Sequence, residues 1–503
     1  MSKPTTSKAS ILKTLSFFLV PLILFFTLRL LSLTRIPVFV DEAIYVRWSQ
    51  VMRAESTYRY LPMTDGKPPL FMWLNAISLD YFTDPLVAGR MISVLAGLVS
   101  FVAVALLGYL YTKKISVAVF ASLIYAILPF ATFFDRMALA DSLLNAFGLL
   151  TLVFSYLYIN NPKRLDLAIF TGVVIGAGLM TKPPAIFFYF FFAFTAAFFG
   201  YKKIKSHLIY LLVGFFLVFF FSQGLYNTLR LSPSFHMIGA RNGDYLFTLS
   251  EVLKHPLNPL IGNLKSVLNW YWYLFTPFSF ILFYSLLWAK EGRRLLLFSF
   301  VLVLLPLLAQ SSMAKVYTSR YILFLSLPLI PALALSAQQL FDSWIFTNKA
   351  IVAVFVASSL GLSAWYMTSP QTAPMPYEMR RGYLEEWTAG YGQVEVADYL
   401  KEISKSGQKI VVFTEGFFGT LPDGLQIYTQ GDKNIVIVGS TPVATVIPEG
   451  LVNTATTNRR FFVINSTRNQ LPADQLAKLK LIAAYPKAIN PAGHQEFLQF
   501  FEY

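Results

Sequence analysis

The sequence VFVDEAIYVRWSQVMRAESTYRYLPMTDGKPPL, residues 38–70, follows the first long apolar run of the chain. It contains the adjacent acids Asp41 and Glu42 and, farther on, an Asp-Gly-Lys-Pro-Pro run at residues 65–69. Asp41 to Arg53 has apolar residues at helical spacing, which predicts a short amphipathic helix on a membrane surface. The stretch therefore predicts a structured polar loop beside a membrane span rather than a flexible connector.

Composition places most of the remaining chain in lipid. The 503 residues are 56% hydrophobic and 13% charged, about half the charged fraction usual in soluble proteins. Apolar runs of about 20 residues, long enough to cross a bilayer as helices, recur up to about residue 368. We expect a polytopic α-helical membrane protein and attribute much of the +15 net charge to short loops between spans. There is no nucleic-acid motif, and without Cys no disulfide or thiolate metal site can form.

About eleven spans are predicted, near residues 12–34, 86–110, 115–134, 137–159, 165–181, 183–200, 207–226, 271–289, 295–313, 320–340 and 350–368. With the N-terminus and its Lys3, Lys8 and Lys13 in the cytoplasm, every inside loop is basic, as the positive-inside rule expects. The first run is interpreted as a retained helix, because no small-residue cleavage site follows it. An odd number of spans then places the C-terminus outside the plasma membrane.

The chain is expected to have three parts. Residues 1–368 form the transmembrane domain, with outer-face loops at 35–85 and 227–270, and residues 369–390 form a linker. Residues 391–503 are more polar and predict a small extracytoplasmic α/β domain. Its expected elements are a helix at 392–404 and strands at 409–413, 434–438, 460–465 and 496–503.

Asp41 and Glu42 have two interpretations. Acids suit the first turn of a helix, where they accept backbone N–H groups and complement the helix dipole. They also suit a general base at the mouth of a membrane cavity, and one helix start accommodates both roles.

Lys67 and Lys182 each precede a Pro-Pro pair at a predicted outer helix start. A turn accounts for Asp65-Gly66, and snorkelling to the membrane interface accounts for Lys182. A cation at a helix start opposes the helix dipole, however, unless an anion binds there too. The repeated motif therefore also predicts a phosphate near these lysines.

Arg136 and Asp141 lie near the outer end of a predicted span. A charge at the centre of a span costs about 2.5–3.5 kcal/mol, so such residues are kept for pairing or for function. A structural pair of Asp141 with Arg136 or Arg90 is one alternative, and a reaction site is the other. Acids beside several cations suit a substrate with a lipid tail and a phosphate head. They do not suit ATP, since there is no Walker loop, and the four scattered His indicate no His-based metal site.

The order of these motifs resembles the dolichyl-phosphate-mannose protein mannosyltransferase family and the related lipid A aminoarabinose transferases. It runs from Asp-Glu through Lys-Pro-Pro-Leu, Ala88-Gly89-Arg90, Arg136 with Asp141 and Thr181-Lys182 to Arg320-Tyr321, within about residues 10–340. The resemblance implies the GT-C membrane fold, a polyprenyl-phosphate sugar donor and inversion at the anomeric carbon. It implies a prokaryotic enzyme, because the chain has no room for a β-trefoil insertion and lacks the Trp-Trp-Asp-Tyr-Gly signature of oligosaccharyltransferases.

In that family the first-loop Asp is the catalytic carboxylate, which implies Asp41 here, and we group Glu42 and Asp141 with it as catalytic candidates. The implied ligands of the donor phosphate are Lys67, Arg136, Lys182 and Arg320. Gly66 stands where many lipid A transferases have Glu, which weakens the case for a bridging divalent metal. A divalent metal stays open, and no other cofactor is predicted.

We therefore expect a glycosyltransferase at the extracytoplasmic face that moves one sugar, mannose or a related one, to an acceptor hydroxyl on protein, lipid or glycan. Its expected partners are the lipid-linked donor, this acceptor and membrane lipid. A flippase or transporter of lipid-linked sugars is the alternative, but it explains neither the one-sided acids nor the outer domain, and the sequence shows no internal repeat. A lipid-linked-oligosaccharide ligase or polymerase, which would use a diphosphate donor, is a third possibility.

Overall fold

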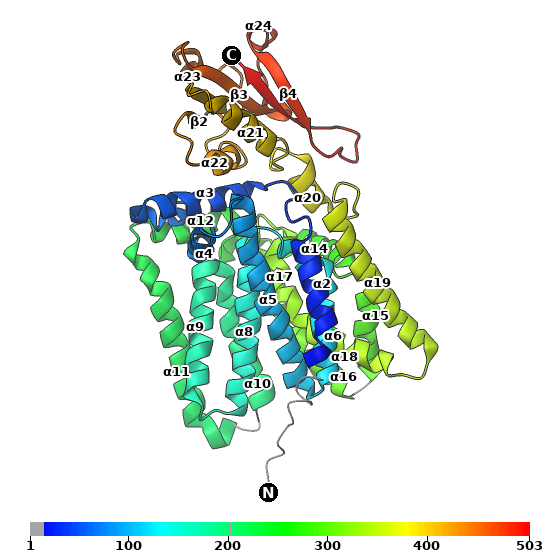
Figure 1. Cartoon of the computed structure of the whole chain (residues 1–503). Helices are drawn as coiled ribbons and strands as arrows, with labels where there is room; N and C mark the ends of the chain where they lie inside the picture. Colours follow the sequence, from blue (N-terminus) through cyan, green and yellow to red (C-terminus); the bar gives the residue numbers. More distant parts are fainter. Residues whose placement is uncertain (1–14, 202–203, 289) are drawn as a thin grey trace. The chain divides into compact units, whose positions relative to one another are not determined.

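The computed structural model describes residues 15–201, 204–288 and 290–503 (Figure 1). The predicted basic residues Lys3, Lys8 and Lys13, and the first residues of the predicted span at 12–34, lie outside this part. Contacts between Cα atoms divide the chain into two compact units. Among the described residues, the first unit holds 15–31, 60–71 and 92–368, and the second holds 32–59, 72–91 and 369–503.

Long apolar helices make up most of the first unit. Each of the eleven predicted spans coincides with helix, and within the described residues seven helices are long and apolar enough to cross a membrane, while four apolar ones are shorter. The helices are α2 (Leu19–Leu30), α5 (Pro85–Thr112), α6 (Ile115–Ile127), α7 (Pro129–Phe134), α8 (Ala140–Asn160), α9 (Leu165–Thr181), α10 (Phe187–Gly200), α11 (Ile204–Asn227), α15 (Phe278–Ser285), α16 (Lys290–Met313), α17 (Leu323–Ser326), α18 (Ile330–Phe341) and α19 (Phe346–Thr368). The chain is therefore a mostly helical, multi-pass membrane protein.

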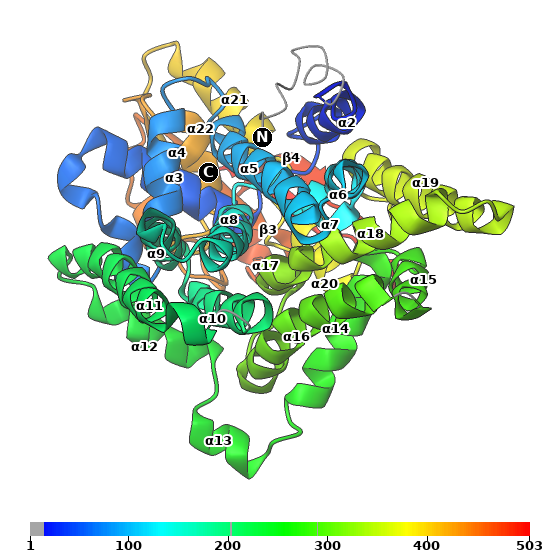
Figure 2. The ribbon, with the colours of Figure 1, turned by 90° about the horizontal axis from the view of Figure 1, so that it is seen from below.

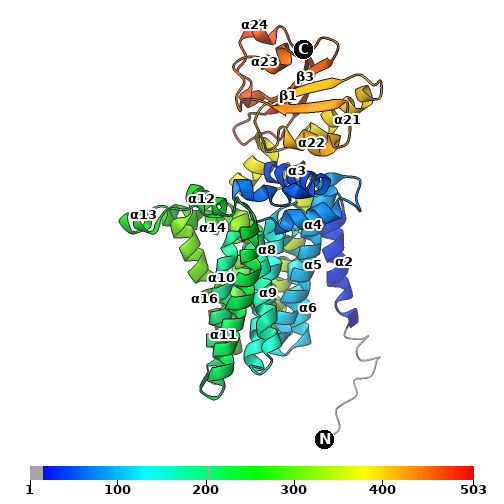
Figure 3. The same ribbon diagram turned by 90° about the vertical axis from the view of Figure 1, so that its left-hand side faces the viewer.

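Helices α8, α9 and α11 lie side by side in the first unit (Figure 3), and Figure 2 shows them end-on. Close approach of α9 to α11 depends on a small residue at the contact. A Cβ on Gly172 would lie 2.7 Å from the carbonyl oxygen of Val218. Small residues bring helices together in lipid because backbone-to-backbone packing replaces the hydrophobic effect there.

Residues 227–270, predicted as an outer-face loop, contain most of three helices: α12 (His236–Tyr245), α13 (Leu249–Lys254) and α14 (Leu260–Leu274). A capping box begins α13, since Thr248 and Glu251 exchange hydrogen bonds with each other's backbone N–H groups. The Pro and Asn residues of this segment conceal these helices in the sequence, and α12 and α13 are also short, with 10 and 6 residues.

The second unit contains α3 (Val40–Ala54), which matches the amphipathic helix predicted at 41–53. The next helix, α4 (Leu70–Ser78), begins after the Pro-Pro pair. The C-terminal part of the unit has the short helices α20 (Tyr377–Arg380), α21 (Gln393–Ser404), α22 (Asp423–Thr429), α23 (Glu449–Val452) and α24 (Ala473–Leu476) and the strands β1 (Ile410–Thr414), β2 (Ile435–Gly439), β3 (Arg459–Asn465), β4 (Lys480–Pro486) and β5 (Phe497–Glu502).

The five strands form one sheet in the order β2-β1-β3-β5-β4. Strands β1, β2 and β3 are parallel, and β5 pairs antiparallel with both β3 and β4. The four predicted strands are present within a residue or two. The edge strand β4 was not predicted, because it ends at Pro486 and all of its side chains are exposed or half-buried.

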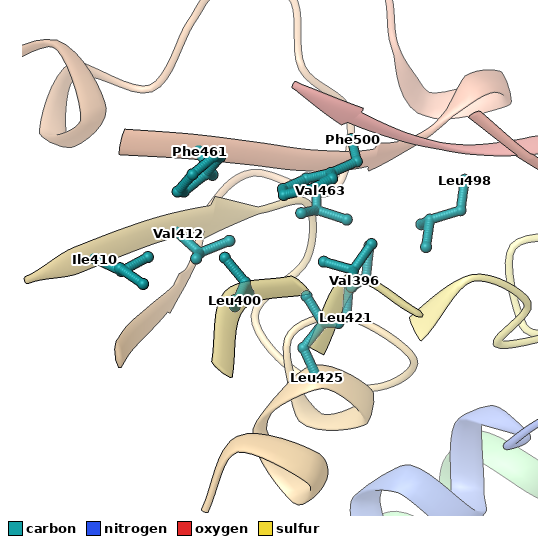
Figure 4. Close-up of a cluster of buried hydrophobic side chains, with 10 residues drawn as sticks. All are labelled: Val396, Leu400, Ile410, Val412, Leu421, Leu425, Phe461, Val463, Leu498 and Phe500. Atoms are coloured by element: carbon teal, nitrogen blue, oxygen red, sulfur yellow. The ribbon is translucent and has the colours of Figure 1, made fainter. Parts of the chain in front are cut away.

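Both faces of this sheet are covered, because the side chains of the central strands alternate in direction. Phe461 and Val463 of β3 pack with Val396 and Leu400 of α21 in one buried cluster (Figure 4). The intervening residues of the same strand face the opposite cluster, which includes Leu451 of α23. A mixed sheet with helices on both sides is the α/β arrangement that the composition predicted.

Helix α3 belongs to the same unit because it packs on α22. Gln50 Nε2 donates a hydrogen bond to the carbonyl oxygen of Ile427 at 2.8 Å. Just before α3, Phe39 forms an antiparallel β-bridge with Ala389, and Gly390 N donates to the Val38 carbonyl at 2.9 Å. The first polar loop and the C-terminal residues therefore fold together.

Candidate active site

The two adjacent acids of α3 have different surroundings. Asp41 lies in the first turn of the helix and is half-buried. Glu42 is completely buried, and its Oε2 accepts the N–H of Phe39 at 2.9 Å, so it caps its own helix. The same carboxylate forms a two-point ion pair with Arg90, with Nε–Oε1 at 2.8 Å and Nη2–Oε2 at 2.7 Å. The carboxylate of Glu42 is therefore held by structural partners within the second unit.

Arg90 extends this structural role to the polypeptide before α3. Its guanidinium also donates to the carbonyl oxygens of Leu33 at 2.6 Å, Ile36 at 2.9 Å and Pro37 at 3.2 Å. Five donors on a rigid planar group suit such a role, because they can satisfy several acceptors at once. Together, Glu42 and Arg90 fix the turn from which Asp41 projects.

Asp141 and Lys182 form an ion pair in the first unit. Asp141, in the first turn of α8, has a side chain that is 3% exposed, and its Oδ1 lies 2.6 Å from Lys182 Nζ at the C-terminal end of α9. The same ammonium lies 4.5 Å from the ring centroid of Tyr321, and the guanidinium of Arg320 lies 5.3 Å from that ring. Two cations therefore lie near a single tyrosine ring, and one of them is paired with a buried acid.

A second charged cluster surrounds Gly66. Lys67 Nζ lies 3.3 Å from Asp65 Oδ2, and Arg241 Nη2 of α12 lies 3.5 Å from Asp65 Oδ1. Arg241 was not singled out in the sequence because it lies in the segment interpreted as a loop. One signal was available, since Arg241 and Asp244 have the helical i, i+3 spacing of an ion pair, and they form one here at 2.9 Å.

Arg136 is buried, and its Nη1 donates to the carbonyl oxygens of Leu28, Arg29 and Leu31 at 2.8–3.0 Å. These acceptors lie at the C-terminal end of α2, where carbonyls lack helical partners and a cation is favoured. Asp135, its neighbour, pairs instead with Arg29 at 2.9 Å. Arg136 thus anchors the end of α2, a role that its position in the sequence did not reveal.

The predicted site residues therefore divide between the two units. Asp41 and Glu42 belong to the second unit, and Asp141, Lys67, Arg136, Lys182 and Arg320 belong to the first. Each of these cations contacts groups of its own unit. The sequence suggested a pair between Arg90 and Asp141, but Arg90 pairs with Glu42, and Asp141 pairs with Lys182. Among the described residues, no group of three or more His, Asp or Glu side chains could hold a metal ion.

Comparison with known proteins connects this arrangement to a fold. The dolichyl-phosphate-mannose-protein mannosyltransferase family matches residues 66–226, which include the two Lys-Pro-Pro motifs and the Arg136 to Asp141 segment. ArnT from Cupriavidus metallidurans, bound to undecaprenyl phosphate, is 14% identical, with a TM-score of 0.57 over 97% of this chain and 98% of that one. The chain has the GT-C fold.

Two further structures support the GT-C assignment. ArnT in the apo state superposes with a TM-score of 0.55 at 15% identity and covers 98% of both chains. The archaeal oligosaccharyltransferase AglB from Archaeoglobus fulgidus, in complex with an inhibitory peptide and a dolichol-phosphate, gives 0.50 at 10% identity, over 98% of this chain and 74% of that chain. Curated protein sequences include no significant match to this chain. The structural similarity to ArnT thus covers residues of both units and not only the matched family segment.

Proposed function

We propose that this protein is an inverting membrane glycosyltransferase. It transfers a single sugar, mannose or a related one, from a polyprenyl phosphate to an acceptor hydroxyl at the extracytoplasmic face, with its N-terminus in the cytoplasm. The observation that carries the proposal is the pairing of Lys182 with buried Asp141 at a helix end of an apolar bundle, beside Arg320. A cation held at the end of membrane helices suits a phosphate whose lipid tail lies among them. The undecaprenyl phosphate bound to ArnT, which has the same fold, supports this donor class.

In the proposed reaction, Asp41 accepts the proton of the acceptor hydroxyl as the oxygen attacks the anomeric carbon. A new C–O bond forms, the bond from that carbon to the phosphate oxygen breaks, and the lipid phosphate leaves with the electron pair. A positioned general base contributes about 10²–10⁴ in rate. Glu42 acts as a positioning residue, because its carboxylate caps α3 and pairs with Arg90.

The cations of the first unit are proposed to stabilise the leaving phosphate. Lys182 and Arg320 do so beside Tyr321, and Lys67 does so with Arg241, which we add to the predicted set. Fixed positive groups in a site of low dielectric stabilise a developing anion more than water does. Arg136 is proposed to contribute indirectly, by fixing the end of α2.

Purified protein in detergent, incubated with a labelled polyprenyl-phosphate mannose and acceptor-containing membranes, tests this proposal. An enzyme releases lipid phosphate without a membrane gradient, whereas a flippase does not, and a ligase or polymerase requires the diphosphate donor. We expect Asp41→Asn to lower turnover by about 10²–10⁴ while donor binding persists. Asp474→Asn is the matched control, since Asp474 also lies in a helical first turn but is exposed on α24. Unchanged turnover in Asp41→Asn would sink the assignment of the base.

A further inference from the structure

A polar cavity lies wholly within the second unit, and the mechanism above does not use it. Its volume is about 660 Å³, which falls in the range of small-molecule sites. Its lining comes from four places: the C-terminal half of α3, the turn between α4 and α5, α21 and α22. The first polar loop and the C-terminal domain therefore build this cavity together.

The charges of the lining balance. Arg53 and Lys401 contribute two cations, and Asp84 and Asp398 contribute two anions. Lys401 lies 3.5 Å from Asp398, so part of this charge is neutralised locally. A ligand rich in phosphate would be expected to select a net positive lining. The balance instead favours a ligand without formal charge.

Aromatic and amide groups complete the lining. Phe82 and Tyr428 are both half-buried in it, beside Gln50 and Gln430. Within the described residues the Tyr428 hydroxyl makes no hydrogen bond, and burial raises its pKa above the usual range, with Asp84 adding to the effect. A neutral phenol in this position keeps a proton to donate and a lone pair to accept.

Uncharged saccharides combine the two features that this lining recognises. Their hydroxyls can donate hydrogen bonds to the carboxylates, and can both donate to and accept from the amides and the phenol. Their C–H faces can pack on the aromatic rings. An extended peptide is usually captured by an exposed strand edge or by an apolar groove. This lining consists of helical and turn residues and mixes polar with apolar groups, so it offers neither a strand edge nor an apolar groove.

We propose that this cavity binds an uncharged saccharide that forms part of the acceptor. The acceptor role rests on the proposed function, whereas saccharide binding does not. Helix α3 connects the cavity with the proposed base. Asp41 lies in the first turn of this helix, and Gln50 and Arg53 in its C-terminal half line the cavity. Asp41 and Gln50 are nine residues apart, or about 14 Å along the helix axis. A glycan held at one end of α3 can thus extend towards the proposed base at the other.

Saturation-transfer NMR on the full-length protein in lipid nanodiscs tests the proposal, with mannotriose and methyl α-mannopyranoside as probes. We expect both to bind, and Tyr428→Ala to weaken mannotriose binding at least tenfold. Tyr428→Phe keeps the ring and is expected to weaken it by a smaller factor, which guards against a folding defect in the alanine variant. Tyr377→Ala is the matched control, because Tyr377 is an exposed tyrosine of the same unit outside the cavity, and it should bind normally.

Two results would overturn the inference: absence of mannotriose binding, or binding that is unchanged in Tyr428→Ala. Binding of mannose 6-phosphate or of a Ser/Thr peptide in place of mannotriose would overturn it as well. Donor turnover by the wild-type protein is measured in parallel. In one further outcome, mannotriose binds the wild-type protein but not Tyr428→Ala, and the wild-type protein shows no donor turnover. That outcome would refute the proposed glycosyltransferase and leave the saccharide site standing.

Discussion

Asp41 and Glu42 show how far a dipeptide can be interpreted without a structure. The sequence was consistent with helix capping and with catalysis for either acid, and the start of one helix could accommodate both roles. In the structure, Glu42 is the residue that caps α3 and pairs with Arg90, which leaves Asp41 as the proposed base. The distinction depends on Arg90, which lies 48 residues from Glu42 in the sequence, so a local pattern could not have revealed it.

The Lys182–Asp141 pair should separate stability from activity. Lys182→Met leaves the buried carboxylate of Asp141 without its cation, and breaking a buried pair in this way costs about 3–5 kcal/mol. Adding Asp141→Asn removes the unpaired charge, so the double variant should recover most of the lost thermal stability. It should not recover turnover, because the double variant still lacks Lys182, the residue proposed to bind the donor phosphate. Melting temperatures and donor turnover in detergent measure the two effects, and a fully active double variant would contradict the role of Lys182.

Glu415 should make the stability of the C-terminal domain depend on pH. It is 2% exposed, and burial raises its pKa from the usual 4.5 to about 7, although hydrogen bonds from Asn465 and the charges of Arg468 and Lys487 favour its ionised form. Between about pH 4.5 and about pH 7 the unfolded chain loses this proton while the folded chain keeps it. Stability therefore falls as pH rises through that window, by on the order of 3 kcal/mol.

Hydrogen exchange of the β1 and β3 amides, corrected for the intrinsic effect of pH, measures this loss. Glu415→Gln has no proton to lose and should flatten the slope between about pH 6 and about pH 7, and reduce it at lower pH. Asp423, whose pKa burial raises to about 6, should keep its own contribution of similar size between about pH 4 and about pH 6. An equal slope in wild type and Glu415→Gln would refute the assignment.

Among the elements, the turn before α4 is fixed by one glycine. Gly66 has a φ of +67°, and a Cβ there would lie 2.5 Å from both the Arg241 Cβ and the Met237 carbonyl oxygen of α12. We expect Gly66→Ala to cost about 1–3 kcal/mol and to lower donor affinity by displacing Lys67 and Arg241. Gly239→Ala is the control within α12, since a Cβ there meets nothing within 4 Å. Thermal unfolding and donor titration measure both variants, and equal behaviour would contradict the packing argument.

Elements with strong local patterns were predictable, and those defined by their neighbours were not. The long apolar runs predicted all eleven helical stretches, and strand-like segments in the more polar C-terminal part predicted β1, β2, β3 and β5. Strand β4 was missed because it depends on pairing with β5 at the sheet edge. The helices at 236–274 were missed because the Pro and Asn residues of this segment indicated a loop, and Arg241 was lost as a candidate with them.

Considered as a whole molecule, the chain could be assigned to a fold from its sequence, but its grouping into units could not. Motif order pointed to a GT-C protein, and the structural comparison agrees over nearly the full length. The association of α3 with α22 depends on contacts between residues more than 350 positions apart, such as Gln50 with Ile427. No periodicity within either segment reports such a contact.

That association sets an order of events during biosynthesis. Residues 32–59 and 72–91 leave the ribosome long before residues 369–503, which complete their unit. About 300 residues intervene, and at about 5–20 residues per second the early segments wait on the order of 15–60 seconds for their partner. During that interval the apolar face of α3 is exposed to other partners. The amphipathic character that predicted a helix on the membrane surface would then serve the nascent chain, with the bilayer holding α3 until α22 replaces it.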